Sequence, residues 1–275
     1  MQEQDSMSHQ FIFTILAVIM QIFLFIIFIT AIAYSVWFLA KGSVKKRIPI
    51  SDIHVSDLIL GEHISFYRRL DEPDKVRFIK DVKEFLQEIL ITPINTSITD
   101  LDKIFVAASA VIPIFSFPGF KYPHLEEVLI YPDTFNMDFE TNTDDRNIMG
   151  LVGTGVYRNK MLLSKTALQG GFGNDPGAAN TAIHEFVHLI DGADGDTDGI
   201  PRILMDNTNA LTWTELIHDE MQKMLEGNSD INPYGLQNRS EFFAVTAEYF
   251  FERPELFKEN HPELFNMMQL IFKTK

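Results

Sequence analysis

Hydrophobic residues follow two different patterns along the 275-residue chain. Between Phe11 and Ala40 no residue is charged, and Ile, Phe, Leu, Val and Ala make up most of the stretch. About 20 apolar residues are enough for a helix to cross a bilayer, so this run predicts a transmembrane helix. The later apolar residues are spaced as in a globular domain. We expect a short tail (1–10), a membrane helix (11–40), a basic linker (41–60) and a domain (61–275).

The charges beside the apolar run predict its orientation in the lipid bilayer. The N-terminal tail carries Glu3 and Asp5 without a basic residue, whereas four basic residues follow the span: Lys41, Lys45, Lys46 and Arg47. By the positive-inside rule, the domain faces the cytoplasm. A cleaved signal peptide has basic residues before a shorter apolar run. We therefore expect a single-pass protein anchored permanently in the cell (inner) membrane.

Helical spacing dominates the domain. Apolar residues recur at helical intervals over 73–91, and the apolar run 104–117 predicts a buried helix that Pro113 interrupts. A helix that begins at Pro176, with Asp175 as N-cap, is expected to end before Gly192. Further helices are expected at 239–251, after the N-cap Asn238 and before Pro254, and at 256–272.

Strand patterns are shorter and lie before residue 170. Residues 128–131 form an apolar run that ends at Pro132 and predicts a strand. Val156-Tyr157 and 161–164 flank a polar turn and predict a hairpin or two edge strands. The fold class is therefore α+β, mainly helical, with a small sheet before the helix at 176–191.

Composition narrows the chemistry. The chain has no cysteine, which excludes disulfides and thiolate metal sites, so a bound metal must use histidine and carboxylate ligands. The net charge of −15 argues against a nucleic-acid-binding surface.

The helix at 176–191 carries the motif His184-Glu185-Phe186-Val187-His188. Histidines four residues apart lie on one face of a helix, so both imidazoles can bind one metal ion. Glu185 lies between them and can hold a metal-bound water, as in zinc peptidases. We therefore predict a Zn²⁺ site at His184 and His188, with Glu185 placed to hold the metal-bound water.

A catalytic zinc site needs a third protein ligand. Glu241 and Glu248 lie seven residues apart on one later helix, and either can reach the site by sequence reasoning alone. His218 and His261 are lone histidines on polar faces, and we interpret each as a surface or helix-cap residue.

The segment Tyr234-Gly235-Leu236-Gln237-Asn238-Arg239-Ser240-Glu241-Phe242-Phe243-Ala244-Val245, continued by Ala247-Glu248-Tyr249, resembles the C-terminal signature of the Mlc titration factor A family. That family comprises zinc peptidases related to the catalytic core of anthrax lethal factor. The resemblance extends over nearly all of the domain and excludes residues 11–40. It implies a zincin-type metallopeptidase fold and hydrolysis of peptide bonds, with an aminopeptidase as one option.

The resemblance also implies roles for individual residues, with Glu185 as the general base. Glu241 becomes the third zinc ligand and Tyr234 stabilises the transition state, while Glu248 and Asp191 orient the ligating imidazoles. The strand at 161–164 would offer an edge to an extended peptide. Because the family's namesake binds a repressor of sugar uptake, a zinc-containing protein that sequesters a transcriptional regulator is the alternative function. A structural zinc domain is a third.

The acidic loop 194–199 resembles the start of a calcium-binding loop, but Met205 occupies the position that needs a carboxylate.

Overall fold

The computed structural model describes residues 20–21, 23, 25–35, 53–141, 143, 146–153, 157–173 and 179–274. The chain divides into two compact units, Met1–Ile48 and Pro49–Lys275. In the first unit the described residues between 20 and 35 are helical. Among the described residues, no helix is both long and apolar enough to cross a membrane. Most of the expected span at 11–40 lies outside the described residues.

The described part of the second unit begins with three helices, a short strand (Leu90–Pro93) and a fourth helix. The helices are α2 (Asp57–His63), α3 (Ser65–Arg68), α4 (Glu72–Glu88) and α5 (Asp100–Ile114). Thr99 and Asp102 form a capping box that starts α5. This helix is buried along most of its length and continues one residue past Pro113. The helix predicted at 73–91 ends earlier than expected, because residues 90–93 form a strand.

A four-stranded mixed sheet follows the order β1-β2-β4-β3. The strands are β1 (Leu90–Pro93), β2 (Glu127–Tyr131), β3 (Gly150–Val152) and β4 (Lys160–Ser164). β1, β2 and β4 are parallel, and only β3 runs antiparallel to its neighbour. The strand predicted at 128–131 is confirmed.

The predicted pairing of Val156-Tyr157 with the strand at 161–164 is wrong. β4 pairs with β3, which lies upstream, while Tyr157 is in a short helical turn and Val156 lies outside the described residues. β4 is therefore an inner strand between β2 and β3, and the free edge beside it belongs to β3. The peptide edge expected at 161–164 is thus corrected to Gly150–Val152.

The helices after the sheet build the rest of the domain. They are α6 (Lys165–Gly171), α7 (Thr181–Asp191), α8 (Asn207–Leu225), α9 (Arg239–Glu252), α10 (Pro254–Asn260) and α11 (Pro262–Phe272), with short 3-10 turns η2 (Gly192–Asp194) and η3 (Pro233–Leu236). α7 begins later than expected, because Asn180 rather than Asp175 is its N-cap; Asp175 and Pro176 lie outside the described residues. Gly192 ends α7, and Asn238 caps α9, as predicted.

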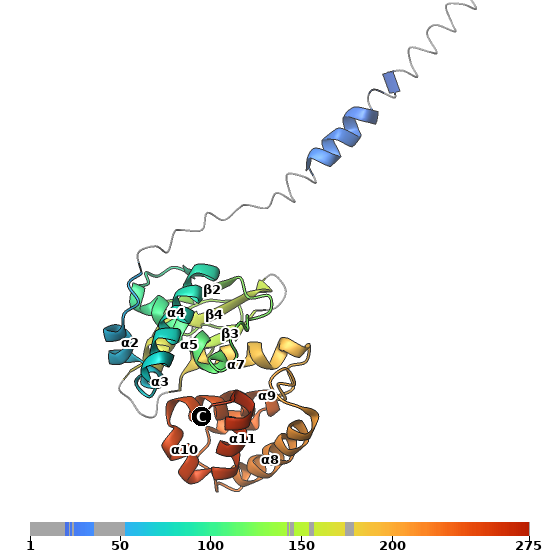
Figure 1. Ribbon diagram of the computed structural model, residues 1–275. Helices are drawn as coiled ribbons and strands as arrows, with labels where there is room; N and C mark the ends of the chain where they lie inside the picture. The colour runs from blue at the N-terminus through green and yellow to red at the C-terminus, as the bar shows by residue number, and fades with distance from the viewer. Residues whose placement is uncertain are drawn as a thin grey trace, which may run out of the picture. The chain divides into compact units, whose positions relative to one another are not determined.

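α7 lies between the two halves of the domain. Figure 1 shows the sheet and α2–α5 on one side of it and α8–α11 on the other. α7 packs against α5, α9 and β3. Its apolar residues Ile183, Phe186, Val187 and Ile190 are fully buried in one continuous core. The mainly helical α+β class with a small sheet is confirmed.

Candidate metal centre

The centre of the site is the polar face of α7. Asn180 accepts a hydrogen bond from the Ile183 amide and fixes the start of this helix. One and two turns later, His184 and His188 bring their Nε2 atoms to 3.0 Å from each other. Both imidazoles therefore offer the same ring nitrogen to one point, as the motif spacing predicts.

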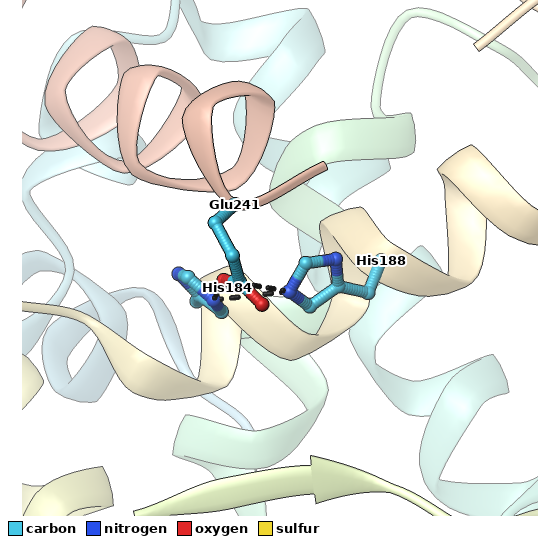
Figure 2. A group of neighbouring side chains, drawn as sticks. All are labelled: His184, His188 and Glu241. Atoms are coloured by element: carbon cyan, nitrogen blue, oxygen red, sulfur yellow. Dashed lines mark hydrogen bonds and ion pairs between the residues drawn. The ribbon is translucent and has the colours of Figure 1, made fainter. Parts of the chain in front are cut away.

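Glu241 approaches this point from the first turn of α9 (Figure 2). Its Oε2 lies 2.9 Å from His184 Nε2 and 3.3 Å from His188 Nε2. One donor atom from each of these residues lies within 4.8 Å of the others. Two imidazoles and one carboxylate are a three-residue donor set that leaves a position open, as catalytic zinc sites do. The residues therefore fit a bound metal ion.

Glu248 occupies a different place from Glu241. Its Oε1 accepts a hydrogen bond from His184 Nδ1 at 2.6 Å, on the side of the ring away from Glu241. Its Oε2 accepts from the Asn180 amide at 3.0 Å. Glu248 therefore ties the ring of His184 to the start of α7. A carboxylate on the second ring nitrogen orients an imidazole and raises its basicity.

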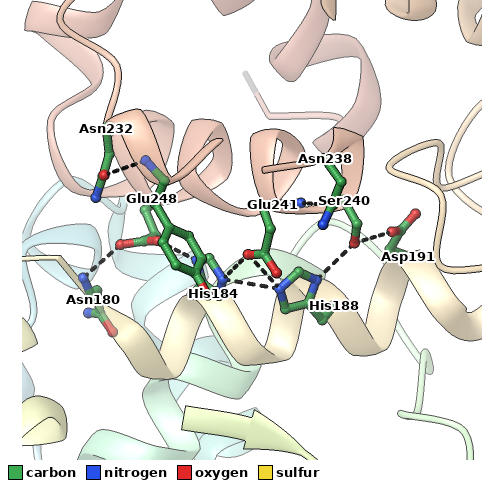
Figure 3. Close-up of polar contacts among 10 residues, drawn as sticks. Asn180, His184, His188, Asp191, Asn232, Asn238, Ser240, Glu241 and Glu248 are labelled. Atoms are coloured by element: carbon green, nitrogen blue, oxygen red, sulfur yellow. Dashed lines mark hydrogen bonds and ion pairs between the residues drawn. The ribbon is translucent and has the colours of Figure 1, made fainter. Parts of the chain in front are cut away.

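His188 is held by a serine and an aspartate (Figure 3). The Ser240 hydroxyl donates to Asp191 Oδ2 at 2.8 Å and lies 3.0 Å from His188 Nδ1. Because the only serine proton goes to the carboxylate, Ser240 must accept from His188 Nδ1–H. This assigns the Nδ1–H tautomer and leaves Nε2 free for a metal. Asp191, expected to orient an imidazole, thus reaches His188 only through Ser240.

The histidines and carboxylates at the site shift one another's pKa values. Burial lowers the pKa of His184, but hydrogen bonds to Glu241 and Glu248 outweigh it and raise this pKa to about 10. Burial raises the pKa of Glu241, whereas hydrogen bonds from His184 and His188 outweigh it and lower this pKa to about 2. The carboxylates therefore favour positive charge between the rings, and a divalent cation would supply that charge in place of the ring proton.

Glu185 lies beside the donor atoms but is not one of them. It is buried, and burial raises the pKa of its carboxyl group against the opposing effect of His184 and His188. Strand β3 packs directly on it: a Cβ at Gly150 would lie 2.6 Å from Glu185 Cγ and 2.7 Å from Oε1. Only glycine allows this approach of backbone to carboxylate.

These groups open into a pocket of about 600 Å³. Tyr234 of η3 lies on its wall, 47% exposed, with its ring edge-on to His184 at 5.9 Å between centroids. Burial and the nearby carboxylates Glu241 and Glu185 raise the pKa of its hydroxyl, which therefore stays protonated and can donate a hydrogen bond. The lining comprises Gly150, Leu151, Val152, His184, Glu185, His188, Thr197, Asp198, Tyr234, Asn238, Arg239, Ser240 and Glu241.

The acidic loop at 194–199 uses its carboxylates internally. Asp194 accepts from the Asp196 and Arg202 amides. Asp198 accepts from the Ile200 amide and from the guanidinium of Arg202. The loop is therefore held by its own hydrogen bonds.

Sequence reasoning missed three residues of this site. Ser240 and Asn180 contact the site only because α9 packs on α7, which no local pattern reveals. Gly150 could be recognised only as a glycine inside a strand, a signal for close backbone approach. His261 was interpreted as a surface or cap residue. It is the cap residue between α10 and α11, as one of the two options predicted, but its side chain is buried between Glu220 and Asp230 and does not lie at the surface.

A family model described as glucose-regulated metallo-peptidase M90 matches residues 45–273. The chain belongs to this metallopeptidase family. Mlc titration factor A of Pectobacterium atrosepticum is 27% identical over 220 residues, which cover 74% of this chain and 79% of the relative. Mlc titration factor A of Cronobacter sakazakii is 28% identical over 212 residues, 71% of this chain and 77% of the relative.

The uncharacterized protein slr2042 of Synechocystis sp. is 27% identical over 222 residues, 77% of this chain and 80% of the relative. The family resemblance drawn from residues 234–249 is therefore confirmed at the level of the M90 and Mlc titration factor A family.

Proposed function

We propose that this chain is a zinc-dependent peptidase whose metal ligands are His184, His188 and Glu241. The observation that carries the proposal is the buried Glu185 carboxylate beside three convergent donor atoms in an open pocket. A purely structural metal site has four protein ligands and no open position. A buried carboxylate beside an open position therefore indicates a catalytic site. Membership of a metallopeptidase family supports the same reaction.

A zinc ion held by His184, His188 and Glu241 would polarise a substrate carbonyl and lower the pKa of a bound water. Glu185 accepts the proton of the attacking water and passes it to the leaving amine. Its raised pKa suits this exchange, because an acid–base group works best near the ambient pH. Tyr234 donates its hydroxyl proton in a hydrogen bond to the oxygen on which negative charge develops.

The peptide would lie in extended form along β3. Among the described residues this strand pairs with β4 alone, and Gly150, Leu151 and Val152 line the pocket beside Glu185. An extended substrate can pair with the free backbone groups of such an edge. The substrate carbonyl that lies beside Gly150 would then point towards the donor atoms of His184, His188 and Glu241.

The test uses full-length protein loaded with one equivalent of zinc and a panel of short peptides and aminoacyl-anilides. We expect hydrolysis that a chelator abolishes and zinc restores. Glu185→Gln should keep the zinc and lose turnover by about 10²-fold or more, because the general base is gone. Equal turnover in Glu185→Gln and wild type would refute the peptidase.

The second candidate is a protein that binds a transcriptional regulator with little turnover. The observation that favours it is the similarity to two relatives named Mlc titration factor A. Under this candidate, Glu185→Gln would bind an Mlc-type repressor as wild type does in a pull-down, and no peptide would be cleaved.

Localisation is part of the proposal. We infer that residues 11–40 anchor the chain in the cell membrane and that the domain faces the cytoplasm. The uncharged apolar run and the basic residues after it support this orientation.

A further inference from the structure

A buried histidine lies away from the metal centre, between two carboxylates. His261 is 8% exposed, and its Nε2 donates to Asp230 Oδ1 at 2.6 Å. Its Nδ1 lies 3.1 Å from Glu220 Oε1, on α8. Both ring nitrogens thus face an acceptor. Such a contact on each nitrogen holds an imidazole in one orientation.

Asp230 is the point where this network meets the chain that leads to the pocket. Its Oδ2 accepts from the Tyr249 hydroxyl at 2.6 Å and from Asn260 Nδ2 at 2.8 Å. Three donors from α9, α10 and the residue after α10 therefore converge on one carboxylate. Its side chain is 45% exposed, so the network is open to solvent at Asp230.

Only three residues separate Asp230 from Tyr234. Ile231 is buried in the core, and the Asn232 side chain accepts from the Tyr234 amide at 3.0 Å. Gly235 packs so closely on α9 that a Cβ there would lie 2.8 Å from Val245. The short segment thus has little freedom once Asp230 is fixed.

Tyr249 belongs to α9, the helix that also carries Glu241 and Glu248. The bond between Tyr249 and Asp230 therefore fixes η3 relative to the helix that supplies the third donor atom. We propose that His261, acting through Asp230, is a positioning residue that holds Tyr234 over the metal centre. The proposal deepens the peptidase function and rests on the role of Tyr234 stated there.

A double-mutant cycle on the full-length, zinc-loaded protein tests it. His261→Gln should lower kcat by about tenfold or more with little change in KM, because a small misplacement of a reacting group is costly. In the Tyr234→Phe background the same substitution should leave kcat unchanged, since there is no hydroxyl left to position. His218→Gln, an exposed histidine on α8, is the matched control.

Three outcomes would overturn the proposal. They are an unchanged kcat in His261→Gln, an equal fall in kcat in both backgrounds, and a wild-type kcat in Tyr234→Phe. If His261→Gln fails to fold, Asp230→Asn breaks the same link from the solvent side and is put through the same cycle.

Hydrogen exchange separates this proposal from the peptidase itself. If the wild type cleaves no peptide, the peptidase proposal fails, and the amides of residues 229–232 and 234–236 report on the positioning. These amides should exchange faster in His261→Gln than in His218→Gln. Equal exchange in the two variants would contradict the link between His261 and η3.

Discussion

Each imidazole of the candidate metal centre is oriented by a polar side chain on its second ring nitrogen. Glu248 accepts a hydrogen bond from His184 Nδ1. Ser240 accepts from His188 Nδ1 and donates to Asp191, so Asp191 orients His188 through Ser240. Such contacts determine which ring nitrogen faces the metal. The two histidines therefore share one helix but are oriented by different partners on α9.

Removing either support should weaken metal binding without abolishing it. We expect Glu248→Gln and Ser240→Ala to lower zinc affinity by about 10- to 100-fold, and Glu241→Ala to lower it further. Competition with a chromophoric chelator measures the affinity. Glu255→Gln, an exposed carboxylate on α10, is the control. A larger loss in Glu248→Gln than in Glu241→Ala would reverse the assignment of the third ligand.

Gly150 provides a second test at the residue scale. In Gly150→Ala the new Cβ would meet Glu185 within 2.7 Å and push the carboxylate from its place. We expect kcat to fall by about 10²-fold while zinc content stays at one equivalent. Gly61→Ala is the matched control, because no atom lies within 4 Å of its added Cβ. Wild-type turnover in Gly150→Ala would show that the position of Glu185 is not critical.

At the scale of the elements, the sequence predicts what local chemistry determines. The caps Asn238 and Gly192 mark α9 and α7 correctly, since capping depends on a few adjacent residues. Strand order does not follow from local pattern, because β4 pairs with β3 on one side and with the more distant β2 on the other. The three-residue strand β3 is too short to show an alternating pattern.

Helix α8 shows a second reason for a missed element. Its buried face includes Glu220 among Trp213, Ile217 and Met224, so the apolar spacing is broken by a carboxylate. That carboxylate is buried because His261 and Lys223 contact it. The same tertiary pairing explains why His261, a helix-cap residue as one interpretation predicted, is buried and does not lie at the surface.

The pairing of α8 with the α10–α11 junction makes stability depend on pH. Burial raises the pKa of Glu220, but hydrogen bonds from His261, Ser229 and Lys223 outweigh it and lower it to about 2. Burial lowers the pKa of His261, but Glu220 and Asp230 outweigh it and raise it above 6.5. The other groups facing this cluster are Tyr249, Asn260 and Arg253, whose guanidinium lies over the Tyr249 ring.

The signs of these two shifts define a pH window. The Glu220 contribution is complete above its ordinary value of 4.5 and is lost as pH falls towards 2. The His261 contribution is complete below 6.5 and is lost as pH rises through its raised pKa. Urea unfolding should therefore show the largest difference between wild type and His261→Gln from pH 4.5 to 6.5. A difference that does not vary with pH would contradict this.

At the scale of the whole molecule, the described residues that line the pocket of the domain include none from the apolar run at 11–40. The family match begins at residue 45, so the chemistry of the pocket and the proposed anchor belong to separate parts of the sequence. The proposed anchor would restrict the proposed peptidase to substrates at the membrane surface. Its presence and its orientation are separate questions, and each has its own measurement.

The orientation prediction depends on four basic residues. We expect the chain to sediment with membranes and to require detergent for release, because residues 11–40 have no charge to keep them in water. A fluorescent protein fused after Lys275 should be bright and a periplasmic phosphatase fused there should be inactive. Replacing Lys41, Lys45, Lys46 and Arg47 with glutamine should weaken this bias, because it removes the basic residues that keep the flank inside. An active phosphatase fusion on the unaltered chain would place the metal centre on the other side of the membrane.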